Sequence, residues 1–335
     1  MHDYMIDPIA RPDYSYPDKP ADNGMLSYSF YDKSCPNLSM IVSATVKLGV
    51  SNGPANPDRS LALHGLEPAP DRVLWRNCHN GCDASVLLDD TKDFKGEKNA
   101  SPNRNSARGF EVIESIKADV EKSCPSTVSC ADILVLAARE AVVMSGGPNW
   151  PIPLGRRDGI TASEKAANEQ LPSPFEPLQN ITAKFVANGL DVKDMVVLSG
   201  GHTIGFAQCS SFKRRLFNFK DTGKPDPTLD SSVLSNLQNF CPNIDGSNNK
   251  TSPLDSQSVY RFDNIYYKNI INNSGLLESD QALIGDPKTE AMVKDYSADQ
   301  FLFSRDFAAS MVKLGNIGVL TGQAGQIRNK CGSIN

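Results

Sequence analysis

A histidine that follows two glycines has the clearest chemical potential in this chain. His202 comes directly after Gly200 and Gly201 and is one of four histidines in 335 residues. Two adjacent glycines cost a helix roughly 1 kcal/mol each relative to alanine, so they indicate a place where a flat or bulky group approaches the backbone. A histidine beside such a surface suits an axial ligand to a planar iron cofactor. The alternative interpretation is a histidine whose ring packs in the core.

Oxygen-bearing side chains in two other stretches could bind a hard cation. Calcium takes roughly six to eight oxygen ligands from carbonyls, hydroxyls and carboxylates. One stretch begins beside the histidine and continues in a downstream loop, and the other has alternating small and polar residues. For the second, a solvated turn is the alternative interpretation. The candidate oxygen donors are Thr203, Asp255, Ser258 and Asp263 in the first stretch and Gly81, Asp83, Ser85 and Glu97 in the second.

The helix that presents His202 is expected to start near Asp191. This residue can cap the free backbone N–H groups, and Asp194 lies in the first turn. Most apolar residues elsewhere recur at spacings of three and four, which predicts helices rather than strands. Residues 210–262 are predicted to be rich in loops. The other expected helices lie within residues 106–124, 130–144, 178–188, 262–273, 289–296 and 301–317, with a first helix around residues 41–50.

Charge and cysteine content narrow the class of protein. The net charge is −5 and no basic run occurs, so nucleic acid is not an expected partner. No apolar stretch is long enough to predict a membrane span. Eight cysteines spread along the chain are typical of disulfides and an oxidising compartment. Residues 1–25 are predicted to be an unstructured leader without the apolar core of a signal peptide, which conflicts with secretion. Glycosylation motifs begin at Asn37, Asn99, Asn180, Asn249 and Asn272.

Four runs together resemble the class III (secretory plant-type) haem peroxidases. They are LSGGHTIG from Leu198, RFDNIYY from Arg261, GLLESDQ from Gly275 and GCDASVLLDD from Gly81. The resemblance covers residues 26–335 and implies an all-α, two-lobed haem peroxidase fold that is stapled by disulfides. Haem would lie between a distal lobe, about residues 26–145 plus the C-terminal helix, and a proximal lobe, about residues 146–298.

The resemblance also implies roles for single residues. His202 would be the axial ligand of haem b, and Asp280 would hold the other ring nitrogen and make the imidazole more anionic. Two calcium ions would occupy the oxygen-rich sets above. Pro172 would lie at the entrance for aromatic substrates, and a buried Asp132–Arg156 pair would be structural. Eight cysteines allow roughly a hundred pairings, and the resemblance selects Cys35–Cys124, Cys78–Cys82, Cys130–Cys331 and Cys209–Cys241.

One segment departs from the resembled pattern. The family places a distal arginine, a distal histidine and a calcium-binding aspartate shortly before a cysteine. An ungapped alignment up to Cys78 puts Arg72 at the distal arginine and Trp75 at an aromatic position. It puts Arg76 at the distal histidine and Asn77 at the aspartate. A guanidinium stays protonated, so Arg76 cannot act as the general base.

No nearby residue replaces the missing base convincingly. His64 lies in proline-rich sequence, and His79 lies in a short loop between cysteines. Asn103 matches the residue that would orient the distal histidine, and here it has no histidine to orient. Losing the carboxylate at Asn77 is expected to weaken the calcium site of Asp83.

Three functions follow as hypotheses. The first is a secreted, monomeric haem peroxidase that reduces hydrogen peroxide, oxidises small phenolic donors and responds to oxidative stress. The second is a haem-binding pseudo-peroxidase, or the product of a misassigned gene, without a distal histidine. The third is a non-haem metal module in which Cys78, His79 and Cys82 bind zinc, although the local sequence offers no fourth ligand.

Overall fold

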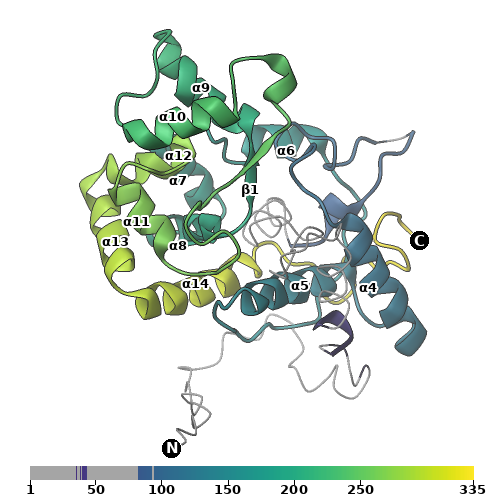
Figure 1. The fold of residues 1–335 in the computed structure, drawn as a ribbon. Helices are drawn as coiled ribbons and strands as arrows, with labels where there is room; N and C mark the ends of the chain where they lie inside the picture. The colour runs from purple at the N-terminus through teal and green to yellow at the C-terminus, as the bar shows by residue number, and fades with distance from the viewer. Residues whose placement is uncertain (1–34, 36–37, 39, 44–81, 93) are drawn as a thin grey trace, which may run out of the picture.

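The computed structural model describes residues 35, 38, 40–43, 82–92 and 94–335 of the chain (Figure 1). Helices form nearly all of its regular structure. Two short strands, β1 (Phe206–Gln208) and β2 (Thr251–Pro253), pair in antiparallel fashion with Ala207 opposite Ser252. This architecture confirms the predicted all-α, two-lobed fold. No helix within the described ranges is both long enough and apolar enough to span a bilayer.

The α-helices follow one another along the chain, with short 3₁₀ turns between them. The 3₁₀ turns are η1 (Ser85–Leu87), η2 (Gly200–Thr203), η3 (Cys209–Ser211), η4 (Phe219–Asp221), η5 (Asp245–Ser247) and η6 (Ala282–Ile284). The α-helices are α4 (Phe110–Ser123), α5 (Cys130–Met144), α6 (Glu164–Gln170), α7 (Leu178–Ala187), α8 (Val192–Ser199), α9 (Lys213–Phe217), α10 (Ser231–Phe240), α11 (Ile265–Ile271), α12 (Glu278–Gln281), α13 (Pro287–Ala298) and α14 (Gln300–Leu314).

The long predicted helices are confirmed as α4, α5, α7, α8, α11, α13 and α14. Of the expected first helix, residues 40–43 are helical and residues 44–50 lie outside the described ranges. The loop-rich prediction for residues 210–262 is wrong in part, because α9 and α10 lie there. Both are short, and α10 starts from a local cap in which the side chain of Asp230 accepts bonds from the N–H groups of Ser232 and Val233. An apolar periodicity does not reveal helices of this kind.

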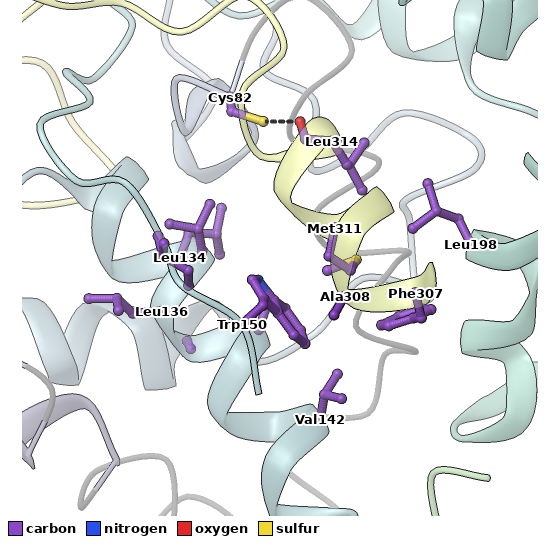
Figure 2. Close-up of a cluster of buried hydrophobic side chains, with 14 of the residues drawn as sticks. Cys82, Leu134, Leu136, Val142, Trp150, Leu198, Phe307, Ala308, Met311 and Leu314 are labelled. Carbon is purple, nitrogen blue, oxygen red and sulfur yellow. Dashed lines mark hydrogen bonds between the residues drawn. The ribbon is translucent and has the colours of Figure 1, made fainter. Parts of the chain in front are cut away.

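The helices form two groups with a shared core. In Figure 1, α4 and α5 lie near the C-terminus, and α7, α8, α11 and α13 form the opposite group. Helix α14 packs against α8, and it meets the α5 side through Trp150, whose ring contacts Phe307 at 6.2 Å between centroids. Figure 2 shows Trp150 between Leu134 of α5 and Ala308 of α14. The α14 helix therefore joins the two groups.

A buried ion pair ties α5 to the end of α14. Asp132 and Arg156 have side chains that are 0% and 1% exposed, and Nη1 of Arg156 lies 3.1 Å from Oδ1 of Asp132. The same guanidinium donates through Nε to the carbonyl of Gly315 at 2.9 Å. A buried charge needs such compensation. The predicted structural pair is therefore present, and it connects α5 with the end of α14.

Three predicted disulfides are confirmed. Cys35–Cys124, Cys130–Cys331 and Cys209–Cys241 have Cα–Cα distances of 5.4, 5.7 and 5.7 Å. Cys82 is disulfide-bonded, and its Sγ lies 3.1 Å from the carbonyl oxygen of Leu314 (Figure 2). Its predicted partner Cys78 lies outside the described residues, so the fourth pairing stays a prediction.

A second, smaller hydrophobic cluster lies beside the main core. It contains both cysteines of the Cys209–Cys241 bridge and draws together residues from β1, α9 and the loop before α12. Its buried members include Ala207, Phe212, Leu216, Leu229, Leu254, Leu276 and Leu277. This cluster anchors the long excursion between His202 and Asp280.

Close packing against other side chains explains why position 200 is a glycine. The sequence had suggested the approach of a planar cofactor instead. A Cβ atom at Gly200 would lie 2.3 Å from the hydroxyl of Tyr267 and 2.6 Å from a ring carbon of Phe303. The flat groups that approach this glycine are therefore aromatic side chains of the protein itself. The interpretation that Gly200 clears space for a planar cofactor is wrong at this position.

Replacing Gly200 with alanine should destabilise the fold. Overpacking in a tight core typically costs about 1–3 kcal/mol, so we expect Gly200→Ala to lower the free energy of unfolding by that amount. Gly246→Ala is the matched control, because no atom lies within 4 Å of the added Cβ. Urea unfolding of both variants measures the difference. Equal stability of the two variants would contradict the packing argument.

Candidate active site

Helix α8 leads to His202, and hydrogen bonds within the helix and to α14 hold its N-terminal end in place. The side chain of Asp191 accepts from the N–H of Asp194 at 2.8 Å, while Asp194 accepts from the N–H of Asp191 at 3.0 Å. This capping box confirms the predicted helix start. Asp194 also accepts from the hydroxyl of Ser310 at 2.6 Å and from the ammonium of Lys313 at 2.9 Å. The start of α8 is therefore locked onto α14.

The central feature of the site is a histidine–aspartate pair. Nδ1 of His202 lies 2.7 Å from Oδ1 of Asp280, although the two residues are 78 positions apart in the chain. The Asp280 side chain is 3% exposed. A histidine that binds a metal almost always donates its other ring N–H to a carboxylate, a backbone carbonyl or water, and here the acceptor is a carboxylate. Nε2 is then the ring nitrogen that would bind a metal.

Two further groups hold Asp280 in place. The hydroxyl of Tyr266 donates to Oδ1 at 3.0 Å, and the N–H of Leu277 donates to Oδ2 at 3.3 Å. The Tyr266 ring also meets the His202 ring edge-on, with centroids 6.1 Å apart. Both carboxylate oxygens are therefore engaged, which fixes the orientation of the imidazole. Tyr266 belongs to the RFDNIYY motif, but that motif alone did not reveal its role.

His202 and Asp280 line a cavity of about 420 Å³ among the described residues. Apolar side chains, including Leu198, Phe185 and Leu283, line it together with polar ones, including Arg104 and Ser106. Pro172, predicted at the substrate entrance, also lines it. A cavity of this size, with several apolar side chains and one strongly oriented histidine, suits a large planar cofactor.

The four residues predicted for the first calcium site lie together. The hydroxyl of Ser258 donates to Oδ2 of Asp255 at 3.1 Å and to Oδ1 of Asp263 at 3.0 Å. The hydroxyl of Thr203 lies 3.4 Å from Oδ1 of Asp263. Burial raises the pKa of Asp255. Two carboxylates and two hydroxyls in one largely buried cluster fit a calcium ion.

Three of the four residues predicted for the second site also lie together. The hydroxyl of Ser85 donates to Oε1 of Glu97 at 2.9 Å, and the N–H of Ser85 donates to Oδ1 of Asp83 at 3.0 Å. Gly81 lies outside the described residues. Burial, together with the nearby charge of Asp83, raises the pKa of Glu97 to about 7. Burial likewise raises the pKa of Asp83. Buried carboxylates that repel each other fit a cation between them.

Neither cluster is built from three or more acidic, histidine or cysteine side chains, and no such group occurs within the described ranges. Hydroxyl and carbonyl oxygens must therefore complete each coordination shell. Such a mixture favours a hard cation such as calcium over zinc, which prefers nitrogen and sulfur ligands.

Calcium removal should make stability fall with rising pH. The folded-state pKa of Glu97, about 7, is raised above its ordinary value of 4.5. Its favourable contribution is therefore complete below about pH 4.5 and is lost as the pH rises through 7. The difference corresponds to about 3 kcal/mol at most. Bound calcium favours the ionised carboxylate and should abolish the loss.

Thermal unfolding in a chelator and in saturating calcium measures this effect. We expect the two melting temperatures to diverge between about pH 5 and pH 8. Glu97→Gln cannot ionise, so its stability in chelator should vary less with pH. A wild-type protein whose stability in chelator does not change over this range would contradict the assignment of Glu97.

The predicted distal residues Arg72 and Arg76 lie outside the described residues, as do Trp75, Asn77 and His79. Asn103, which the resemblance pairs with the distal histidine, is described and is 1% exposed. Its amide nitrogen donates to the carbonyl of Glu97 at 2.9 Å. Its Oδ1 has no hydrogen-bond partner within the described part of the chain. Asn103 therefore contacts the second calcium cluster through Glu97, and its own Oδ1 is a buried acceptor without a partner among the described residues.

Comparison with known proteins gives a consistent result. A family model described as peroxidase matches residues 55–299. The chain is 61% identical to Peroxidase 10 of Arabidopsis thaliana over 310 residues, which is 92% of this chain and 86% of that protein. It is 49% identical to Peroxidase N of Armoracia rusticana over 320 residues, with 94% and 93% covered. For Peroxidase P7 of Brassica rapa subsp. rapa, the identity is 46% over 312 residues, with 92% and 100% covered.

Proposed function

The chain belongs to the class III family of plant peroxidases, and we propose that it reduces hydrogen peroxide and oxidises small phenolic donors with a haem b bound by His202. The observation that carries this proposal is the 2.7 Å contact between His202 Nδ1 and Asp280 Oδ1 beside a large cavity. A core histidine without a ligand role needs no buried carboxylate with two further donors.

The residues present fit the proposed cofactor. Haem, when bound, would supply the iron that reacts with peroxide and stores the oxidising equivalents. His202 would hold this iron, and Asp280 would increase the electron density on the imidazole. Tyr266 and the N–H of Leu277 would keep the carboxylate in that position. Leu198 and Phe185 would exclude water from the proximal face.

We propose that the enzyme reacts slowly with peroxide, because its distal side lacks a general base. Arg72 would stabilise the negative charge that develops on peroxide. Arg76 cannot take the peroxide proton and return it to the departing oxygen, because its guanidinium stays protonated. Pseudo-peroxidase function is the second candidate, and an arginine in place of an imidazole at position 76 favours it. The Oδ1 of Asn103 is a buried acceptor that has no hydrogen-bond partner within the described residues. That acceptor lies at the position that would orient a distal histidine.

Two calcium ions complete the proposal. The cluster of Thr203, Asp255, Ser258 and Asp263 should bind the tighter ion, because all four predicted residues converge. The cluster of Gly81, Asp83, Ser85 and Glu97 should bind more weakly, because asparagine replaces a carboxylate at position 77. Calorimetric titration distinguishes the two sites, and two equally tight ions would contradict this order.

We propose an extracellular location, because the three described disulfides persist in oxidising compartments. Phenolic donors would approach past Pro172, which lines the cavity on the side of Ser173 and Phe175. The protein would act as a monomer. The glycosylation motifs at the exposed residues Asn99, Asn249 and Asn272 are accessible to modification.

A haem titration tests the proposal directly. Purified protein is mixed with haemin, and its visible absorption is measured before and after hydrogen peroxide is added. We expect a sharp Soret band, a spectral change with peroxide and slow oxidation of guaiacol. A Soret band without guaiacol oxidation would support the pseudo-peroxidase. The absence of a Soret band would overturn both candidates.

A further inference from the structure

The loop before α12 determines where Asp280 lies. The N–H of Leu277 donates to Asp280, and the N–H of Gly275 donates to the side chain of Gln281 at 3.2 Å. Backbone groups on both sides of Leu276 therefore contact α12 directly. Any movement of residues 275–277 would move the carboxylate that holds His202.

A single buried arginine from α9 grips this loop. Nη1 of Arg215 donates to the carbonyls of Gly275, Leu276 and Leu277, with the last two at 3.3 and 3.5 Å. Its Nε donates to Oδ2 of Asp226 at 2.6 Å. The Arg215 and Asp226 side chains are 1% and 3% exposed. The guanidinium therefore converges on three consecutive carbonyls of the segment that precedes Asp280.

Asp226 is itself held firmly, so it can fix the guanidinium. Its Oδ1 accepts from the N–H and the hydroxyl of Thr228 at 2.9 and 2.7 Å. Although burial opposes it, the hydrogen bond from Arg215 helps to lower the pKa of Asp226. Its own N–H donates to the carbonyl of Arg215 at 2.9 Å. The two residues thus form a closed unit of backbone and side-chain contacts.

This unit does more than stabilise a core. Buried ion pairs are often no more stabilising than apolar residues of similar volume, and the surrounding cluster is already apolar. Leu276 and Leu277 pack there with Phe212 and Leu216. Apolar packing holds the loop against the cluster. It does not prevent the loop from sliding over that surface, whereas directional hydrogen bonds to the carbonyls fix where the backbone lies. The planar guanidinium of Arg215 suits that task, because it presents Nε to Asp226 and Nη1 to the loop carbonyls in one fixed geometry.

We propose that Arg215 is a positioning residue for the His202–Asp280 pair, acting through the backbone of residues 275–277. The inference rests on the proposed function, because the positioning of Asp280 would alter the properties of iron bound to His202. If the loop loosens, Asp280 withdraws from Nδ1 and the imidazole becomes less anionic. The reduction potential of the bound iron should then rise.

The chain offers a closely matched control. Arg156 is also 1% exposed, pairs with a buried aspartate and donates to backbone carbonyls. Its contacts are to Asp132 and Gly315, in the part of the fold that joins α5 to α14. Arg215→Lys and Arg156→Lys each keep the charge and remove the fork. Both variants should lose thermal stability.

Of the two lysine variants, only Arg215→Lys should change the reduction potential of the bound iron. We measure the reduction potential of the haem-loaded wild type, Arg215→Lys, Arg156→Lys and Asp280→Asn. Arg215→Lys should shift the potential upward, in the same direction as Asp280→Asn and by less, while Arg156→Lys should match the wild type. Equal shifts in the two lysine variants, or no shift in Arg215→Lys, would overturn the positioning role.

Hydrogen exchange of the haem-free protein gives a second readout. Peptides covering residues 275–281 should exchange faster in Arg215→Lys than in Arg156→Lys, and unchanged protection of that segment would overturn the proposal. If Arg215→Lys does not fold, Asp226→Asn replaces it with the same expectations. A wild-type protein without a Soret band would overturn the proposed function as well, whereas a normal band with unshifted potentials overturns the positioning role alone.

Discussion

Replacing His202 with alanine is expected to abolish the sharp Soret band that the wild-type protein should give with haemin. The reason is geometric, because His202 is the histidine that Asp280 orients at the wall of the cavity. Without an axial nitrogen, haem would be held by apolar contact alone. We expect a weak, broad band and rapid transfer of haem to a competing acceptor such as apomyoglobin.

The other histidines provide controls for this result. The chain has four, at positions 2, 64, 79 and 202. His64→Ala and His79→Ala should leave the Soret band unchanged if neither ring binds the iron from the proximal side. Circular dichroism of each variant confirms that the helices persist. An unaltered Soret band in His202→Ala would refute the ligand assignment, and loss of the band in His79→Ala would indicate another ligand.

The sequence could indicate which residues of the proximal side lie together because short motifs carry them. His202, Asp280 and the four residues of the first calcium cluster lie in runs with distinctive residue types, and the structure brings each set together. Helix starts were predictable for a similar local reason. The capping box of Asp191 and Asp194 involves residues only three positions apart.

The residues that position the site were not predictable in this way. Arg214 and Arg215 are neighbours in a short basic run, yet the first is exposed and the second is buried. What separates them is the tertiary contact with Asp226 and with carbonyls 60 to 62 residues away. Gly200 was misinterpreted for the same reason, since only the fold shows that Tyr267 and Phe303 press against it.

Restoring a distal histidine should produce the largest gain in activity. We expect that replacing residues 61–82 with a family-like segment, which carries arginine, histidine and aspartate at the distal positions, will speed the reaction with peroxide. General acid–base catalysis typically contributes about 10²–10⁴-fold, so the gain should be at least of that order. Stopped-flow absorption of the haem-loaded protein measures the rate constant for the first spectral change after mixing with peroxide.

The physical reason lies in the proton that peroxide must transfer. A neutral imidazole accepts it from one oxygen and donates it to the other, whereas the guanidinium of Arg76 stays protonated and can do neither. Arg72 can stabilise negative charge on the oxygens, but it cannot start the transfer. A fixed positive charge at position 76 could also oppose the approach of a proton donor.

Two smaller changes separate the base from the rest of the replaced segment. Arg76→His in the original chain should recover part of the gain, because it restores an imidazole without restoring the surrounding loop. The family-like segment with its histidine changed to alanine should lose the gain while keeping the arginine and the aspartate. Asn103 should matter only when the imidazole is present, since its Oδ1, which has no partner within the described residues, can then accept a hydrogen bond from the ring N–H. If the unmodified protein oxidises guaiacol as fast as the repaired one, the distal site does not lack a base, and His64 or His79 must supply it.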